Sequence, residues 1–148
     1  MRRYDYPEVV VGAMVLDRKG RVLLVRSEKW PNIYSVPGGH VELGESIYDA
    51  TLRETMEETG LKVKPVRALN LQEAVFPKEF HRKAHFIFID VLCRADSTDV
   101  RLDNRELYDY KWIKPKDSLR LRLNTYTRRA IRQLAGKSKK EWFYAEAE

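Results

Sequence analysis

The chain has 148 residues, 43% of them apolar, which is enough for one sizeable core and predicts a single domain over residues 1–148. Its 28 Lys and Arg against 22 Asp and Glu give a net charge of +6, which favours polyanionic partners such as nucleotides, nucleic acids or anionic lipids. The lone Cys93 excludes an internal disulfide, and no apolar run reaches the roughly 18 to 20 residues of a membrane span, so we expect a soluble, cytoplasmic protein.

The first third of the chain has the pattern of strands followed by a loop. Two β-branched runs, residues 8–17 and 21–27, flank a short polar stretch and predict a hairpin with Gly20 in its turn. A shorter strand is expected over residues 33–36. Residues 37–45, PGGHVELGE, then predict a glycine-rich loop.

A helix is predicted over residues 46–60. Ser46 and Asp49 have the spacing of a capping box, and Gly60 supplies a stop signal. A second helix is expected over residues 124–136, with Asn124 as its N-cap.

Three more strands are predicted between the helices, over residues 61–76, 84–93 and 107–113. This mixture contains too few helices to cover both faces of a parallel sheet regularly. It therefore favours an α+β, sandwich-like fold.

The first helix carries three acidic residues on one face. Glu54 lies three and four positions before Glu57 and Glu58, and each like-charge pair costs roughly 0.2 to 0.5 kcal/mol on a helix. One interpretation is a solvated face softened by Arg53. The other is a Mg²⁺ site, since this hard cation binds carboxylates together with substrate phosphates, and the glycine-rich loop before the helix permits close approach of a ligand.

The stretch from Gly38 to Leu61, GGHVELGESIYDATLRETMEETGL, resembles the Nudix box, G-x5-E-x7-R-E-U-x-E-E-x-G-U. Two glycines, four glutamates and an arginine fall at the box spacing, and the structural members of the box are Gly39, Glu45, Arg53 and Gly60. One departure is Thr55, which stands where the box has a bulky apolar residue. A threonine methyl can still pack there.

The resemblance implies the Nudix fold, in which a mixed curved sheet lies between helices, and it implies a Mg²⁺ cofactor, with Mn²⁺ as an alternative. The implied metal ligands in the box are the carbonyl of Gly38 and the carboxylates of Glu54, Glu57 and Glu58. Glu54 or Glu57 would accept the proton of the attacking water, and Arg53 would orient the carboxylates together with Glu45. Dimers are usual in this family, although no stretch of the sequence specifies an interface.

Further site residues follow from the similarity to bacterial nucleoside triphosphatases and GDP-mannose mannosyl hydrolases. Glu106, six positions before Trp112, matches a metal ligand of these enzymes. The mannosyl hydrolases carry a catalytic histidine directly after that residue, where this chain has Leu107, and this favours hydrolysis at phosphorus. Arg26 resembles a phosphate-contacting arginine, and Asn124 resembles an asparagine that reads a base edge.

The implied reaction is hydrolysis of a nucleoside diphosphate linked to a group X, with a (deoxy)nucleoside triphosphate giving monophosphate and pyrophosphate as the favoured case. Pro77, sixteen residues after Leu61, resembles a mark of ADP-ribose pyrophosphatases and keeps nucleotide sugars as an alternative. A dinucleoside polyphosphate or a capped RNA is a third. An alternative of another class is a non-catalytic nucleotide- or RNA-binding Nudix module, whose usual mark would be loss of the acidic set.

Three further features have weaker interpretations. The segment around Lys78, Arg82 and Lys83 is a basic loop that could meet a polyphosphate or remain solvated. The loop aromatics Trp30 and Phe80 could stack on a base or cover the core edge. The C-terminal cluster Trp142–Tyr144 is expected to dock on a sheet edge.

Overall fold

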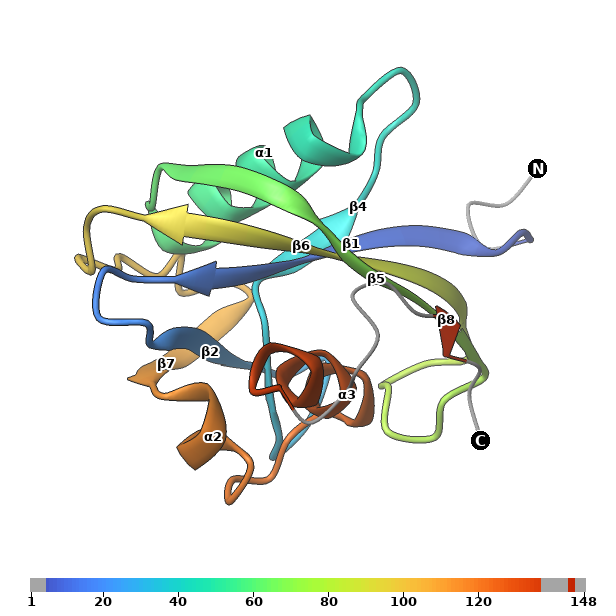
Figure 1. Ribbon diagram of the computed structural model, residues 1–148. Coiled ribbons are helices and arrows are strands. Elements are labelled where there is room, and N and C mark those ends of the chain that lie inside the picture. The colour runs from blue at the N-terminus through green and yellow to red at the C-terminus, as the bar shows by residue number, and fades with distance from the viewer. Residues whose placement is uncertain (1–4, 137–143, 146–148) are drawn as a thin grey trace.

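The computed structural model describes residues 5–136 and 144–145. In this part of the chain, an 8-stranded mixed sheet has α1 on one face and α3 on the other (Figure 1). The strands are β1 Glu8–Leu16, β2 Val22–Ser27, β3 Tyr34–Ser35, β4 Gly38–His40, β5 Val63–Val75, β6 His85–Ala95, β7 Leu107–Ile113 and β8 Tyr144–Ala145. The helices are α1 Ile47–Thr59, α2 Pro115–Ser118 and α3 Thr125–Leu134. This arrangement confirms the predicted α+β fold with a mixed sheet between helices.

Strand β1 organises the sheet, whose main order is β3-β2-β1-β6-β5-β8, with β4 paired to β1 and β7 paired to β2. It runs parallel to β6 from Glu8 opposite Phe86 to Leu16 opposite Arg94. The predicted hairpin is paired only next to its turn, because β1 and β2 pair at Leu16 and Val22 and then separate. β1 continues along β4 and β6, whereas β2 continues along β7.

Helix α1 begins and ends where its sequence signals predict. The Ser46 side chain accepts from the Asp49 N–H, and Gly60 adopts φ 71° at the C-terminus. Thr55 is fully buried, and its hydroxyl donates to the Thr51 carbonyl at 2.7 Å. The departure from the box pattern is therefore accommodated, because the methyl packs and the hydroxyl has a partner.

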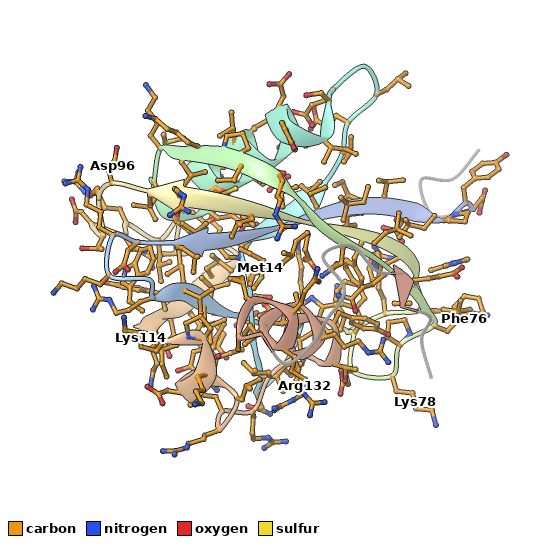
Figure 2. All side chains as sticks on the ribbon, in the orientation of Figure 1. Met14, Phe76, Lys78, Asp96, Lys114 and Arg132 are labelled. Atoms are coloured by element: carbon orange, nitrogen blue, oxygen red, sulfur yellow. The ribbon has the colours of Figure 1, made fainter. Side chains whose placement is uncertain are left out.

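Helix α3 covers the opposite face of the sheet. Ala130 and Ile131 pack against Met14, Val22 and Leu24, and Figure 2 shows Met14 between the sheet and α3. None of the helices in the described residues is long and apolar enough to cross a membrane.

Two short elements were not predicted. Strand β4 lies inside the expected glycine-rich loop, and it forms because glycine permits its close approach to β1: a Cβ on Gly38 would lie 2.0 Å from the Val11 carbonyl oxygen. Helix α2 begins at Pro115, whose ring suits the first helical position.

The C-terminal prediction is borne out only for the described main chain, where Tyr144 pairs in parallel with Leu71 at the sheet edge. Trp142 and Phe143 lie outside the described residues.

Candidate active site

Arg53 holds the acidic face of α1 together. Its Nε and Nη2 donate to the two carboxylate oxygens of Glu45 at 2.7 and 2.9 Å, and its Nη1 donates to Glu54 at 2.9 Å and Glu57 at 3.3 Å. A fifth bond runs from Nη2 to the His40 carbonyl at 3.0 Å. These bonds hold the pKa of Glu45 down at about 2, so Arg53 and Glu45 form a fixed ion pair that joins the box loop to the helix.

Glu54 lies directly over the backbone of Gly39. A Cβ at Gly39 would be 2.4 Å from the Glu54 carboxyl carbon, so only glycine leaves room for this side chain. Burial raises the pKa of Glu54, and the hydrogen bond and charge of Arg53 oppose that rise. The carboxylate is thus half-buried but held by a cation.

Glu58 is the most buried of the box glutamates, with 4% of its surface exposed. Its carboxylate accepts the Gly38 N–H at 3.2 Å. Burial, together with the negative charges of Glu54 and Glu106, raises the pKa of Glu58 to about 9. The fold therefore brings three carboxylates close enough to repel one another.

Main-chain hydrogen bonds position Glu106 beside Glu54 and Glu58. The Arg101 N–H donates to the Thr59 carbonyl at 2.8 Å and the Asp103 N–H donates to the Glu58 carbonyl at 3.2 Å, which ties the segment before β7 to the end of α1. The Asp103 carboxylate then accepts the N–H groups of residues 105, 106 and 107, each at 3.3 Å. Asp103 thus holds the turn from which Glu106 projects.

The carboxylates border a cleft of about 880 Å³, which adjoins an inner pocket of about 110 Å³. Residues of the box, of the basic loop 76–84 and of the turn before β7 line the cleft. The residues that line both compartments are Val10, Lys29, Trp30, Gly38, Glu58, Phe88 and Glu106.

Asp90 and Gly12 lie side by side in the wall of the inner pocket. A Cβ on Gly12 would lie 2.4 Å from the Asp90 carboxylate, and Gln72 donates to that carboxylate at 3.1 Å. Burial raises the pKa of Asp90 to about 7, against the opposing hydrogen bonds of Gln72 and Asn70. A buried group with a shifted pKa in the wall of a pocket marks a candidate binding site.

Asn124 lines the same pocket, but half of its amide is engaged. Its Oδ1 accepts the N–H groups of Tyr126 at 2.8 Å and Thr127 at 3.2 Å, as an N-cap does. Its side chain can therefore donate to a pocket occupant, whereas both lone pairs of Oδ1 already serve the cap.

Arg26 lies elsewhere. Its guanidinium sits 5.3 Å from the Tyr34 ring and 5.5 Å from the Tyr108 ring, with Asp109 at 3.9 Å, and it lines neither compartment. Successive residues of a strand point to opposite faces, so the next residue of β2, Ser27, is the one that reaches the inner pocket.

The loop between β5 and β6 forms the far wall of the cleft. Trp30 and Phe80 pack with ring centroids 4.7 Å apart, so they cover the core edge and also face the cleft. Within the basic loop, Arg82 has a partner inside the protein, because it donates to both carboxylate oxygens of the buried Glu8 at 2.9 and 2.6 Å. The ion pair between Arg82 and Glu8 thus anchors the loop to β1.

The donor chemistry of this site fits a hard divalent cation. In the described part of the chain, no three acidic, histidine or cysteine side chains already converge as a closed ligand set. Arg53 draws Glu54 and Glu57 toward itself, while the negative charge of Glu106 contributes to the raised pKa of both Glu54 and Glu58. Carboxylates that repel one another beside a cleft are the ligands that Mg²⁺ takes in proteins.

Three residues at the site were not predicted. Asp90 lies within the apolar strand predicted over residues 84–93, and an acid among buried residues is itself a signal. Lys29 and Asp103 belong to no motif of the sequence. Their roles depend on contacts between distant segments.

Comparison with known proteins places this geometry among hydrolases. Residues 6–134 match the model of the NUDIX domain family. The chain is 37% identical over 121 residues to the m7GpppN-mRNA hydrolase NUDT17 of Xenopus laevis, covering 72% of this chain and 41% of that protein. It is also 37% identical over 110 residues to the NAD-capped RNA hydrolase NudC of Chromobacterium violaceum, covering 73% of this chain and 39% of that protein. The chain therefore spans about two fifths of the length of these relatives.

Solved structures resemble the chain over almost their whole length. A MutT protein from Methanosarcina mazei superposes with a TM-score of 0.74 at 25% identity, covering 92% of this chain and 99% of that one. A MutT NUDIX hydrolase from Burkholderia pseudomallei gives a TM-score of 0.75 at 26% identity, covering 88% of this chain and 99% of that one.

Proposed function

The chain belongs to the NUDIX domain family and, like the relatives it resembles, is a hydrolase that acts on pyrophosphate bonds. On that premise we propose that it is a Mg²⁺-dependent enzyme that cleaves a nucleoside diphosphate linked to a group X. The first candidate substrate is a (deoxy)nucleoside triphosphate, cleaved to monophosphate and pyrophosphate. One observation carries the proposal: the carboxylates of Glu54 and Glu106 add their negative charge to that of the buried Glu58 at a cleft that adjoins an inner pocket.

The residues that would hold the cation are the Gly38 carbonyl and the carboxylates of Glu54, Glu57, Glu58 and Glu106. When bound, Mg²⁺ would offset the charge of the phosphates and lower the pKa of a water in the site. Mn²⁺ has the same preference for oxygen ligands and would serve as a substitute.

The protein's own groups supply positioning and proton transfer. A water oxygen attacks phosphorus, the P–O anhydride bond breaks and the water's proton passes to a carboxylate, for which Glu54 and Glu57 are the candidates. Arg53 donates a hydrogen bond to both carboxylates, so it orients whichever of them accepts the proton. Glu45 in turn fixes Arg53 through two bonds.

The inner pocket would receive the nucleobase. Asn124 offers a donor there and no free acceptor, so it would contact an acceptor on the base edge. Asp90 supplies a second polar group whose raised pKa, about 7, lets it accept or donate near neutral pH.

A second candidate is cleavage of the pyrophosphate in a capped RNA. Two relatives at 37% identity are named as hydrolases of capped RNA. The segment of α2 and α3 also presents exposed cations, among them Lys116 and Arg132, and Figure 2 shows Lys78 extending outward from the loop between β5 and β6. Such cations would favour a substrate that carries an RNA backbone.

Product analysis separates these candidates. The purified protein with Mg²⁺ is incubated with the eight common nucleoside and deoxynucleoside triphosphates, ADP-ribose, NAD, a dinucleoside tetraphosphate and a capped oligoribonucleotide, in water enriched in ¹⁸O. Mass spectrometry then identifies the products and the phosphorus that received the label. We expect monophosphate and pyrophosphate from a triphosphate, and a loss of turnover of about 10²- to 10⁴-fold in Glu57→Gln.

Two outcomes would contradict the proposal. Turnover of none of these compounds would overturn hydrolysis of nucleoside diphosphate derivatives. Equal nucleotide binding by wild type and Glu57→Gln, with turnover by neither, would instead support a binding module.

A further inference from the structure

We propose that Lys29 and the divalent cation compete for Glu106, and that cation binding releases the Lys29 ammonium to bind the substrate phosphate nearest the junction of the inner pocket and the cleft. The second half of this inference rests on the proposed function. The first half concerns the protein and the cation alone.

The contact that carries the proposal is the ion pair between Lys29 Nζ and Glu106 Oε1, at 3.2 Å. Both side chains are about half exposed, at 48% and 45%. Exposed pairs of this kind contribute little and exchange readily. Mg²⁺ has twice the charge of an ammonium and prefers carboxylate oxygens, so it would displace Lys29 from Glu106.

Lys29 also stands where a substrate must pass. Among the described residues that line both compartments, it is the one with a positive charge. A base in the inner pocket is joined through its ribose to a diphosphate at the carboxylates, and the α-phosphate is the phosphate nearest this junction. That phosphate would meet the Lys29 ammonium.

The backbone of Lys29 is anchored while its charged end is free to change partner. Its N–H donates to the Ser27 hydroxyl at 3.1 Å, and its carbonyl accepts the His81 N–H at 3.2 Å. The stem of the side chain therefore starts from a fixed point between the inner pocket and the loop that forms the far wall of the cleft. Its four-carbon chain lets the ammonium move from a carboxylate to a nearby phosphate.

This exchange would couple the cation and the substrate. A cation on Glu106 frees Lys29 for phosphate, and a phosphate on Lys29 frees Glu106 for the cation. Each ligand then raises the affinity for the other by the same factor.

The first test measures Mn²⁺ alone, by electron paramagnetic resonance titration without nucleotide. We expect Lys29→Gln to bind Mn²⁺ about 2- to 5-fold more tightly than wild type, because the competing cation is gone. Lys116→Gln, an exposed lysine on α2 that lines neither compartment, is the charge-matched control and should leave the affinity unchanged.

A double-mutant cycle shows whether the effect passes through Glu106. Glu106→Gln removes the shared carboxylate, so adding Lys29→Gln to it should no longer change Mn²⁺ affinity. The proposal is overturned if Lys29→Gln binds Mn²⁺ equally or more weakly, or if its gain persists unchanged in the Glu106→Gln background.

The second test uses the nucleotide that the product screen identifies. Lys29→Gln should raise KM at least 10-fold and leave kcat within about 3-fold, since the lost contact binds ground state and transition state alike. An unchanged KM overturns the phosphate contact. If wild type hydrolyses none of the compounds, the proposed function fails, and the Mn²⁺ cycle still decides the exchange at Glu106.

Discussion

Asp90→Asn should remove the loss of stability that ionisation of this buried carboxyl group causes as the pH rises. Asp90 is 6% exposed, and its pKa is raised from 3.8 to about 7 by burial. Between these two values the folded protein binds a proton that the unfolded chain does not, so the free energy of unfolding falls as the pH rises. The full penalty at alkaline pH is about 4 kcal/mol, because each pKa unit corresponds to about 1.4 kcal/mol.

The amide variant keeps the shape of the side chain and an acceptor for the Gln72 N–H, but it cannot ionise. Urea unfolding at pH 5, 6, 7 and 8 gives the free energy of unfolding of both proteins. The advantage of Asp90→Asn over wild type should widen by about 2 to 3 kcal/mol from pH 5 to pH 8, most steeply below pH 7.

An opposite trend is expected at Asp17, which makes it the control. Hydrogen bonds from Arg21 and Lys19 outweigh burial and lower the pKa of Asp17, so its ionised form stabilises the fold. Asp17→Asn should therefore lose stability relative to wild type above pH 4, and the difference should shrink as the pH falls below that value. Parallel pH profiles for Asp90→Asn and wild type would refute a raised pKa at Asp90.

Four further changes probe the box and the inner pocket. Arg53→Lys keeps the charge but loses the two-bond contact with its carboxylate partner, so kcat should fall at least 10-fold and Tm by about 3 to 6 °C in steady-state kinetics and calorimetry. Gly39→Ala should displace the Glu54 carboxylate and lower kcat about 10²-fold, while circular dichroism reports a folded protein. Glu58→Gln should raise the Tm of the metal-free protein only above about pH 9, where Glu58 would otherwise carry a buried repelling charge, and should abolish any rise in Tm on addition of Mg²⁺. Asn124→Asp keeps the acceptor that caps α3 and loses the donor to the pocket, so KM should rise at least 10-fold with unfolding free energy within about 0.5 kcal/mol of wild type, whereas Asn124→Ala should also lose about 1 kcal/mol.

The elements that local chemistry controls could be predicted from the sequence. Ser46, Gly60 and Asn124 bound their helices because a cap needs only a side chain or a φ value within three or four residues. The box residues were identified because their spacing is itself a motif. The structure then brings Arg53 and Glu45 into contact, as the resemblance implies.

The remainder depends on pairing between distant segments, which no local pattern specifies. Arg82 looked like a free cation until the sheet brought it to Glu8, 74 residues away. Arg26 looked like a phosphate contact, yet the alternation of β2 and the pairing with β7 turn it toward Tyr34 and Tyr108. Strand β4 was not predicted because glycines normally indicate a loop, whereas here they let the backbone approach β1 closely.

The convergence of the acidic groups is imposed by the backbone, and this explains why a site of mutual repulsion persists in a stable fold. The end of α1 accepts hydrogen bonds from Arg101 and Asp103 through the carbonyls of Thr59 and Glu58. These bonds involve main-chain atoms and form regardless of the charge on any carboxylate. These main-chain hydrogen bonds thus hold Glu106 near Glu58, and the charge of Glu106 does not weaken them. Because the repulsion cannot be relieved by moving the segment apart, it is relieved by binding, whether of a proton by Glu58, of Lys29 by Glu106, or of a divalent cation by both.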